Sequence, residues 1–316
     1  MSTTSHQLVP SHARPPARVA IRCADSYQAD LAALLLETLG EFALPVRGKS
    51  VLLKPNFVGP DPLGVVNTHP AVVAAARESF LRLGAAKVVV GDGPALERDT
   101  EAIAEAMRLR EYLGPLSPSF VDLNLDDVRR VALRTRASRL RELYLPETVL
   151  AADLVVSMPK LKTHHWAGVT LSLKNMFGIV PGSCYGWPKN VLHWAGITRA
   201  LLDLNSTVRP GFAIVDGIVG MEGNGPIQGK PKPCGVLVLG DDPVAVDATC
   251  ARIMGLVPER IEHLEQASYL LGHLKEQNIR QLGESIARVR TPFDVLAEFR
   301  RIKAKGNEHL WNMNCV

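Results

Sequence analysis

Apolar residues follow two alternating patterns along most of the chain. Short runs rich in valine, leucine and isoleucine are typical of buried strands, whereas the longer stretches between them carry apolar residues at helical spacing. The predicted strands are 17–23, 50–54, 86–90, 119–123, 153–158, 212–215 and 235–239. The predicted helices are 28–42, 69–83, 99–110, 191–204 and 243–254.

Near-continuous apolar strands separated by helices indicate an α/β fold, with a mostly parallel sheet covered by helices on both faces. We expect a flexible tail at 1–15, one α/β domain at 16–290 and a C-terminal tail at 291–316. The domain is long enough to form two lobes, 16–150 and 151–290, with a site between them.

The composition of the chain limits the kinds of molecule that we expect the protein to bind. The chain has 316 residues, with 36 Lys and Arg against 32 Asp and Glu, a net charge of +4, and only 5% aromatic residues. This dilute charge and the small number of stacking residues argue against nucleic-acid binding. The sequence shows neither an apolar leader nor an apolar run of ~18 residues. We expect a cytoplasmic protein without a membrane partner that acts on a small molecule, and homo-oligomerisation stays open.

Polar clusters follow four of the predicted strands. They begin at Lys54-Pro55-Asn56, Gly91-Asp92-Gly93, Lys160 and Asp216-Gly217. Each cluster alone has an ordinary interpretation as turn chemistry. Because functional groups in parallel sheets gather beyond the carboxyl ends of the strands, four clusters at one edge favour a functional site.

The third cluster is the richest in groups that transfer protons. It contains His164, His165 and His193 together with Lys160, Lys162 and Lys174. Histidine titrates near neutral pH and binds divalent metals, and a lysine in apolar surroundings can act as a base or a nucleophile. The alternative is that some of these side chains pack or only solvate a loop.

The fourth cluster is rich in glycine between residues 217 and 229. Glycines at this density let backbone N–H groups approach an anion, although a long structural turn explains them equally well. Asp216 and Glu222 in this cluster are carboxylates that can orient a histidine or hold a cation.

The motifs KPN, GDG, MPKLKTHHWAGVTLSLKNMFGIVPG, IVDGIVGMEGNGP and GDDPVAVDA resemble those of the DUF362 family, in order from about residue 51 to 250. Many relatives carry an appended ferredoxin domain, which suggests an iron–sulfur or electron-transfer protein as an alternative function. The five cysteines here are scattered, without a CxxC pair, and do not reproduce that domain.

The central string is also similar to that of lactate racemase and its relatives, which use a nickel-pincer nucleotide. The order of His164 or His165, Lys174 and His193 matches that family. The resemblance implies a histidine acid/base, a lysine that anchors the cofactor and a later histidine that binds nickel. The family's diglycine before the lysine is replaced here by Ser172-Leu173.

We therefore predict an enzyme for metal- or cofactor-assisted proton or hydride transfer, as in a racemase, epimerase or redox enzyme, on a small anionic oxygenated metabolite. Nickel-pincer nucleotide and iron are the cofactor hypotheses, and a non-catalytic anion-binding module is a further alternative. The expected catalytic residues are His164, His165, Lys174, His193 and Lys54. The expected substrate- or cofactor-binding residues are Asn56, Asp92, Lys160, Lys162, Asn175, Gly223, Asn224 and Gly225. The expected metal ligands are His193, Asp216 and Glu222.

Overall fold

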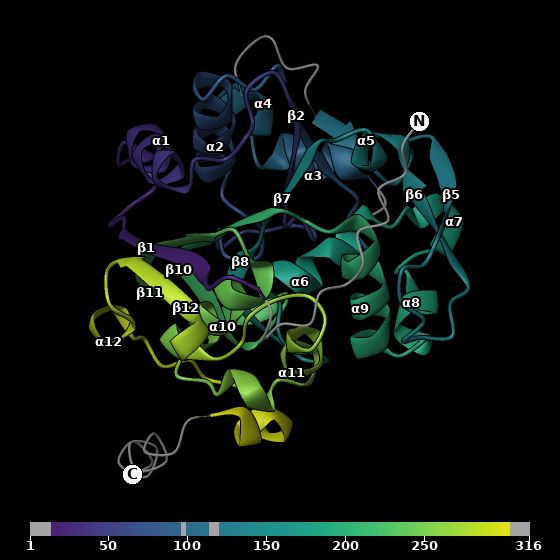
Figure 1. The fold of residues 1–316 in the computed structure, drawn as a ribbon. Coiled ribbons are helices and arrows are strands. Elements are labelled where there is room, and N and C mark those ends of the chain that lie inside the picture. The colour runs from purple at the N-terminus through teal and green to yellow at the C-terminus, as the bar shows by residue number, and fades with distance from the viewer. Residues whose placement is uncertain (1–13, 96–98, 114–119, 304–316) are drawn as a thin grey trace.

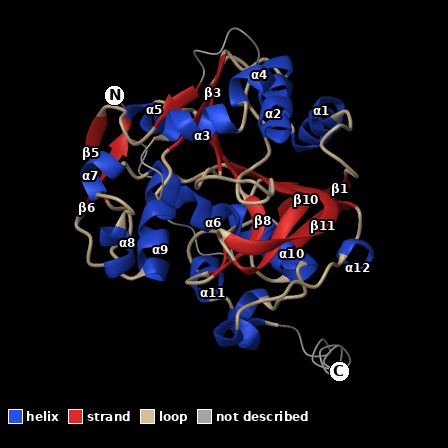
Figure 2. Cartoon of the chain, turned by 180° about the vertical axis from the view of Figure 1, so that it is seen from behind, coloured by secondary structure: helices blue, strands red, loops and turns tan. Residues whose placement is uncertain are grey.

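A single large sheet runs through the molecule (Figure 2). The computed structural model describes residues 14–95, 99–113 and 120–303, so most of the expected tail 1–15 and residues 304–316 lie outside the described residues. The strand order is β12-β1-β11-β10-β7-β2-β3-β4. These strands are β1 (Ala17–Cys23), β2 (Ser50–Pro55), β3 (Lys87–Asp92), β4 (Phe120–Asp122), β7 (Leu154–Met158), β10 (Phe212–Asn224), β11 (Gln228–Gly240) and β12 (Ile279–Gly283).

Every neighbouring pair in this order is parallel except the two pairs that β11 makes, with β1 and with β10. This arrangement confirms the predicted α/β fold with a mostly parallel sheet. Strands from both sides of residue 150 share the sheet, because β2 pairs with β7. The short strand β8 (Lys160–His164) adds to β10 and to β9 (Gly168–Val169), and β5 (Val128–Ala132) pairs with β6 (Glu142–Pro146) as a separate hairpin.

Helices cover both faces of the sheet (Figure 1). Alternate residues of one strand enter different cores: Val51 and Leu53 pack on one face and Leu52 on the other. The first face is covered by α1 (Leu31–Phe42), α2 (Pro70–Arg82), α3 (Thr100–Ala106) and α4 (Leu109–Leu113). The second face is covered mainly by α6 (Leu171–Asn175), α9 (Ile197–Val208), α10 (Pro243–Ile253) and α11 (Glu262–Ser268).

Two predicted helices are each divided in the structure. The prediction at 99–110 corresponds to α3 and α4, which are separated where Arg108 takes a φ of 54°. The prediction at 191–204 corresponds to α8 (Asn190–Trp194) and α9, with Gly196 at a φ of 92° between them. Positive φ interrupts right-handed helical geometry, so each stretch forms two helices.

The glycine-rich segment is neither a helix-capping loop nor a long turn. It forms the end of a hairpin in which β10 and β11, each 13 residues long, pair antiparallel as far as Asn224 and Gln228. Both strands therefore extend far beyond the predicted 212–215 and 235–239. Within the described residues, no helix combines the length and apolarity that crossing a membrane requires.

Candidate active site

A cavity of about 190 Å³ lies beyond the carboxyl ends of β2 and β3. Its walls come from these strand ends, from β8, and from α6 and α8 with the loops around them. The structure thus brings together residues that are far apart in the sequence, such as Lys54 and His193, which are separated by 139 positions. The sequence-predicted residues that line the cavity are Lys54, Asn56, Lys162, His164, His165, Lys174, Asn175 and His193.

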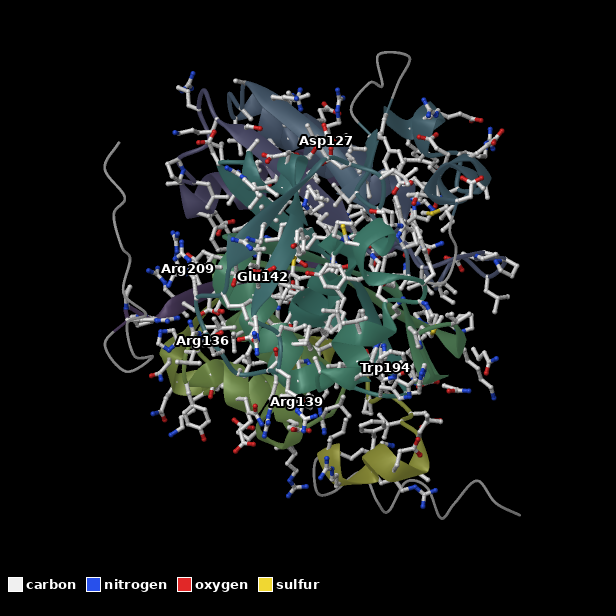
Figure 3. The ribbon with its side chains drawn as sticks, turned by 90° about the vertical axis from the view of Figure 1, so that its right-hand side faces the viewer. Asp127, Arg136, Arg139, Glu142, Trp194 and Arg209 are labelled. Atoms are coloured by element: carbon white, nitrogen blue, oxygen red, sulfur yellow. The ribbon has the colours of Figure 1, made fainter. Side chains whose placement is uncertain are left out.

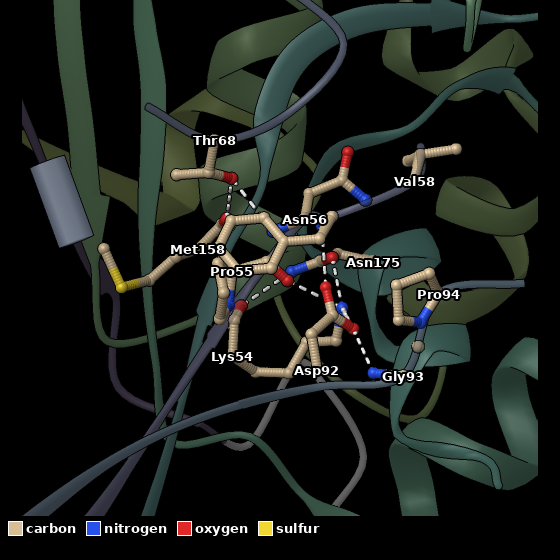
Figure 4. A network of polar contacts seen from close by, with 12 residues as sticks. Lys54, Pro55, Asn56, Val58, Thr68, Asp92, Gly93, Pro94, Met158 and Asn175 are labelled. Atoms are coloured by element: carbon tan, nitrogen blue, oxygen red, sulfur yellow. Dashed lines mark hydrogen bonds and ion pairs between the residues drawn. The ribbon is translucent and has the colours of Figure 1, made fainter. Parts of the chain in front are cut away.

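The floor of the cavity is a buried ion pair between Lys54 and Asp92, whose Nζ and Oδ1 atoms are 2.7 Å apart (Figure 4). Lys54 also donates to the carbonyl of Pro55 and to Oδ1 of Asn175. Asp92 accepts the backbone N–H groups of Phe57 and Gly93. The three acceptors use the three N–H bonds of the ammonium, so Lys54 and Asp92 position the site and do not offer a free group to a ligand.

Asn175 and Gly178 lock this floor in place. The Asn175 amide donates to the Lys54 carbonyl at 3.0 Å and to Oγ of Ser157 at 3.1 Å. At Gly178 an added Cβ would lie only 2.3 Å from the Lys54 amine. A side chain there would force the ion pair apart, and the glycine is needed for this close approach.

Three further lysines surround the cavity without a carboxylate within 4 Å among the described residues. Lys162 donates to the carbonyl of Val66 at 2.5 Å and to that of Pro226 at 3.3 Å. Lys189 donates to the carbonyls of Gly93 and Gly178. Lys174 has no hydrogen-bond partner among the residues that the structure describes, and its amine lies over the ring of Phe177, 4.4 Å from the centroid.

Burial disfavours the charged form of these amines. It lowers the pKa of Lys174 to about 8, with the Lys54 charge adding to the effect. Burial also lowers the pKa of Lys189 to about 7, although Asp92 opposes that shift. The pKa of Lys162 is lowered well below its usual range by burial, against the opposing charge of Asp61. A bound anion would favour the charged state of those amines that contact it.

Backbone contacts give the adjacent histidines opposite tautomers. Nδ1 of His164 accepts the N–H of Trp166 at 3.0 Å, so the proton of its neutral ring lies on Nε2. Nδ1 of His165 lies 3.0 Å from the carbonyl of Gly225 and must donate to it, which leaves Nε2 as an acceptor. The two rings stack with centroids 5.0 Å apart. One neutral imidazole can therefore donate a proton while its neighbour accepts one.

His193 approaches the same cavity from α8. Its ring stacks on Phe177 and meets Trp166 edge to face, whereas the next residue, Trp194, is 77% exposed at the surface (Figure 3). Burial, assisted by the charge of Lys174, lowers the pKa of His193 to about 4. Burial also lowers the pKa of His164 well below its usual value. Both rings are neutral at pH 7.

Buried polar atoms without a partner also face this region. Oδ1 of Asn56, Oγ1 of Thr170 and Nδ1 of His193 have no hydrogen bond within the described residues, and all three residues line the cavity. Unsatisfied buried polar atoms are costly and are expected where a ligand completes the hydrogen bonds.

Lys160 and Asp216 do not line the cavity. They form a second buried ion pair, with Nζ and Oδ2 2.9 Å apart. The hydroxyl of Tyr27 accepts from Lys160 and donates to Asp216, and the ring of His69 stacks on that of Tyr27. The sequence predicts Lys160 as a binding residue and Asp216 as a metal ligand. In the structure each charge is paired with the other, so neither group is free for that role.

The predicted residues of the glycine-rich segment do not line the cavity, and one of them, Gly225, contacts a histidine that does. Glu222 pairs with Lys232 at 3.0 Å and accepts the N–H of Asp294, and Asn224 is bonded to Gln228 at the exposed hairpin end. Gly223 has a φ of +83° close to the hairpin end. The carbonyl of Gly225 accepts both the backbone N–H and Nδ1–H of His165, so this residue positions an imidazole.

The donor set does not fit the predicted metal centre. Glu222 and Asp216 are engaged elsewhere, and the described part of the chain holds no group of three or more His, Cys, Asp or Glu side chains suited to a metal ion. The described cysteines, Cys23, Cys184, Cys234 and Cys250, lie on four different elements, and Cys315 lies outside the described residues. They offer no iron–sulfur ligand set.

Lys189 and Thr170, a lysine and a threonine that were not predicted as site residues from the sequence, also line the cavity. Lys189 precedes α8 with a φ of 65°, a conformation that is unusual for a residue with a side chain and often occurs at functional sites. Its sequence signal was its place between the motif residues Lys174 and His193.

Comparisons with known proteins agree on the family. The model described as "Domain of unknown function (DUF362)" matches residues 51–252. A thylakoid-associated protein of Synechocystis sp. is 34% identical over 246 residues, which are 75% of this chain and 73% of that protein. The name of that relative refers to thylakoids, and a cytoplasmic location for this chain stays a prediction.

Among solved structures, the lactate racemase apoprotein from Thermoanaerobacterium thermosaccharolyticum is similar with a TM-score of 0.40 and 16% identity. The match covers 66% of this chain and about half, 51%, of the racemase. Similarity at this level carries no argument about activity. The family match and the curated relative are sufficient for one conclusion: the chain belongs to the DUF362 family.

Proposed function

We propose that the cavity is the active site of an enzyme that binds a small anionic, oxygenated metabolite and transfers a proton at a carbon next to its carboxylate or next to its carbonyl group. The observation that carries the proposal is the imbalance of charge in the cavity wall. Four lysines surround about 190 Å³, and within the described residues only Lys54 has a carboxylate partner.

Lys162 and Lys189 supply the anion-binding part. Each amine is held by carbonyl oxygens, which orient it without neutralising it. A carboxylate or phosphate between them would form charge-assisted hydrogen bonds in surroundings that exclude most water. The free oxygen of Asn56 and hydroxyl of Thr170 are polar groups that can select the uncharged part of the metabolite.

His165 and His164 supply the proton-transfer part. Nε2 of His165 is the general base that accepts a proton from carbon, because Gly225 holds the other ring nitrogen as a donor. Nε2–H of His164 donates to the oxygen on which negative charge develops, and the lysines stabilise that charge. No step in this mechanism passes through a metal or a nickel-pincer nucleotide.

The test is exchange of carbon-bound hydrogen for deuterium. A panel of 2-hydroxy and 2-oxo acids is incubated with the protein in D₂O and followed by NMR. We expect exchange of at least one panel member, and loss of that exchange in His165→Asn, whose amide can still donate to Gly225. Lys49→Met removes an exposed lysine instead and serves as the control.

Calorimetric binding of the same acids separates the two halves of the proposal. If the acids bind saturably, and Lys162→Met loses both this binding and the deuterium exchange, the anion-binding half and the enzymatic half of the proposal are both supported. Binding without exchange would overturn the enzymatic half and leave an anion-binding module. Exchange that survives in His165→Asn would overturn the assignment of the base.

A further inference from the structure

Lys174 is the amine in the cavity for which anion binding is not an obvious role. Lys54, Lys162 and Lys189 each donate to fixed oxygen atoms, whereas Lys174 has no hydrogen-bond or ion-pair partner among the described residues. Its amine rests over the face of the Phe177 ring and lines the cavity. Within the described part of the chain, no hydrogen bond or ion pair therefore holds this amine in its charged form.

The surroundings of Lys174 favour an uncharged amine. Lys174 lies on α6 close to Leu171 and Leu173, which pack in a core, and its amine is buried. The positive charge of the buried Lys54 disfavours the charged form of this amine further. With a pKa of about 8 against the usual value of about 10.4, Lys174 holds about a hundredfold more neutral amine at pH 7 than an ordinary lysine. Only the neutral amine is a nucleophile.

The neighbouring groups match the needs of carbonyl addition. Lys162 and Lys189 can hold a carboxylate, which places an adjacent carbonyl carbon within the same cavity as Lys174. Nε2–H of His164 is a donor for the carbonyl oxygen as it becomes a hydroxyl. Binding next to a positioned nucleophile converts addition into an intramolecular step.

We infer that Lys174 forms an imine with the carbonyl carbon of a small oxo acid, so that the metabolite is a carbonyl-bearing anion. The amine nitrogen forms a bond to carbon, its two hydrogens leave with the carbonyl oxygen as water, and one further proton gives the iminium. The iminium draws electrons from the adjacent carbon and makes its hydrogen acidic towards His165. This inference rests on the proposed function only for anion binding and for the base.

The experiment is reductive trapping with pyruvate as the probe. The full-length protein is incubated with pyruvate and sodium cyanoborohydride, which delivers hydride to the imine carbon and leaves a stable secondary amine. Peptide mapping by mass spectrometry locates the adduct. We expect Lys174 to carry most of it, with a yield at least ~10-fold above that at the exposed Lys49 in the same digest.

Two variants control this test. Lys174→Arg keeps the positive charge and removes the nucleophile, so the adduct should disappear while calorimetric binding of pyruvate persists. Lys49→Arg should trap at Lys174 as well as the unmodified protein does. Mapping on the unmodified protein does not depend on the folding of either variant.

The outcomes distinguish this inference from the proposed function. Adduct spread over surface lysines, or located on Lys189, would overturn the inference. If pyruvate binds and exchanges deuterium without any adduct on Lys174, the inference fails and the proposed function stands. If pyruvate neither binds nor is trapped, the inference is overturned for 2-oxo acids, and the remaining acids of the exchange panel decide the proposed function.

Discussion

Two clusters of buried side chains in this fold contain lysine, and they differ in how the lysine charge is balanced. In the closed cluster, Lys160 is paired with Asp216, and Tyr27 and His69 complete the contacts. In the open cluster, Lys162, Lys174 and Lys189 line a cavity, and within the described residues their amines contact carbonyl oxygens or an aromatic ring and no carboxylate.

Lys160 and Lys162 come from the same strand, β8, two residues apart. Their side chains therefore leave the strand on one face, opposite Leu161, which packs in the core. What separates their roles is the partner that the rest of the fold provides. Lys160, which is paired with a carboxylate, is part of the scaffold, whereas under the proposed function a buried lysine without a carboxylate is available for a ligand.

The largest expected effect is on the closed cluster. Asp216→Asn leaves Lys160 buried without its counter-charge and should reduce the free energy of unfolding by about 3–5 kcal/mol. Chemical denaturation measures the loss. Glu78→Gln, which breaks an exposed pair with Arg82, should cost less than about 1 kcal/mol. A loss in Asp216→Asn no larger than that in Glu78→Gln would contradict the assignment of the Lys160–Asp216 pair to the buried scaffold.

The open cluster should respond in the opposite way. Lys189→Met removes a desolvated charge, so the free energy of unfolding should stay the same or rise, while binding of a 2-oxo or 2-hydroxy acid should weaken about 10- to 100-fold through the lost charge-assisted hydrogen bond. Thermal denaturation and calorimetry give the two values. A large loss of stability without a loss of affinity would make Lys189 part of the scaffold.

The pH dependence of binding should follow the lysines of the open cluster. Anions bind protonated amines, and the pKa of Lys189, which is proposed to bind the anion, is about 7. Affinity should therefore be highest below pH 7 and decline as pH rises through 7–8, by up to about tenfold per pH unit for each linked proton. Calorimetry at pH 8 in two buffers of different ionisation enthalpy should show proton uptake. Proton release on binding would contradict this assignment.

The smallest expected effect tests the closed cluster alone. Tyr27→Phe removes the hydroxyl that contacts Lys160, Asp216 and the N–H of Val219, and should cost about 1–2 kcal/mol of unfolding free energy. Anion affinity should stay unchanged, because Tyr27 does not line the cavity. A parallel loss of affinity would show that the two clusters are coupled.

Apolar periodicity was sufficient to predict the fold class and most of its strands. Val51, Leu52 and Leu53 are buried on both faces of the sheet, and this continuous apolar run is what identifies a covered parallel strand. The strand β8 was missed because its exposed-looking residues, Lys160 and Lys162, are in fact buried. Their alternation with Leu161 was a strand signal hidden by their polarity.

The candidate site could be predicted as a set of residues but not as a division of roles. Strand ends pointed to Lys54 and Asn56, and the motif pointed to His164, His165 and Lys174; all five line the cavity, and their roles stay a prediction. The sequence does not show that Asp216 is consumed by Lys160, because that pairing depends on the register between β8 and β10. Which lysines lack a carboxylate is a property of three-dimensional packing.

The length and register of the β10–β11 hairpin determine where the imidazole of His165 lies. At one end β11 is locked between β1 and β10, and at the other the carbonyl of Gly225 holds His165. A slip of one residue would reverse the inward and outward faces of the strand, so the register is strongly specified. Single-residue insertions along either arm should thus displace Gly225 from His165 and, under the proposed function, abolish deuterium exchange even where the exposed tip is unchanged. The length of the hairpin is therefore constrained by the position that His165 requires.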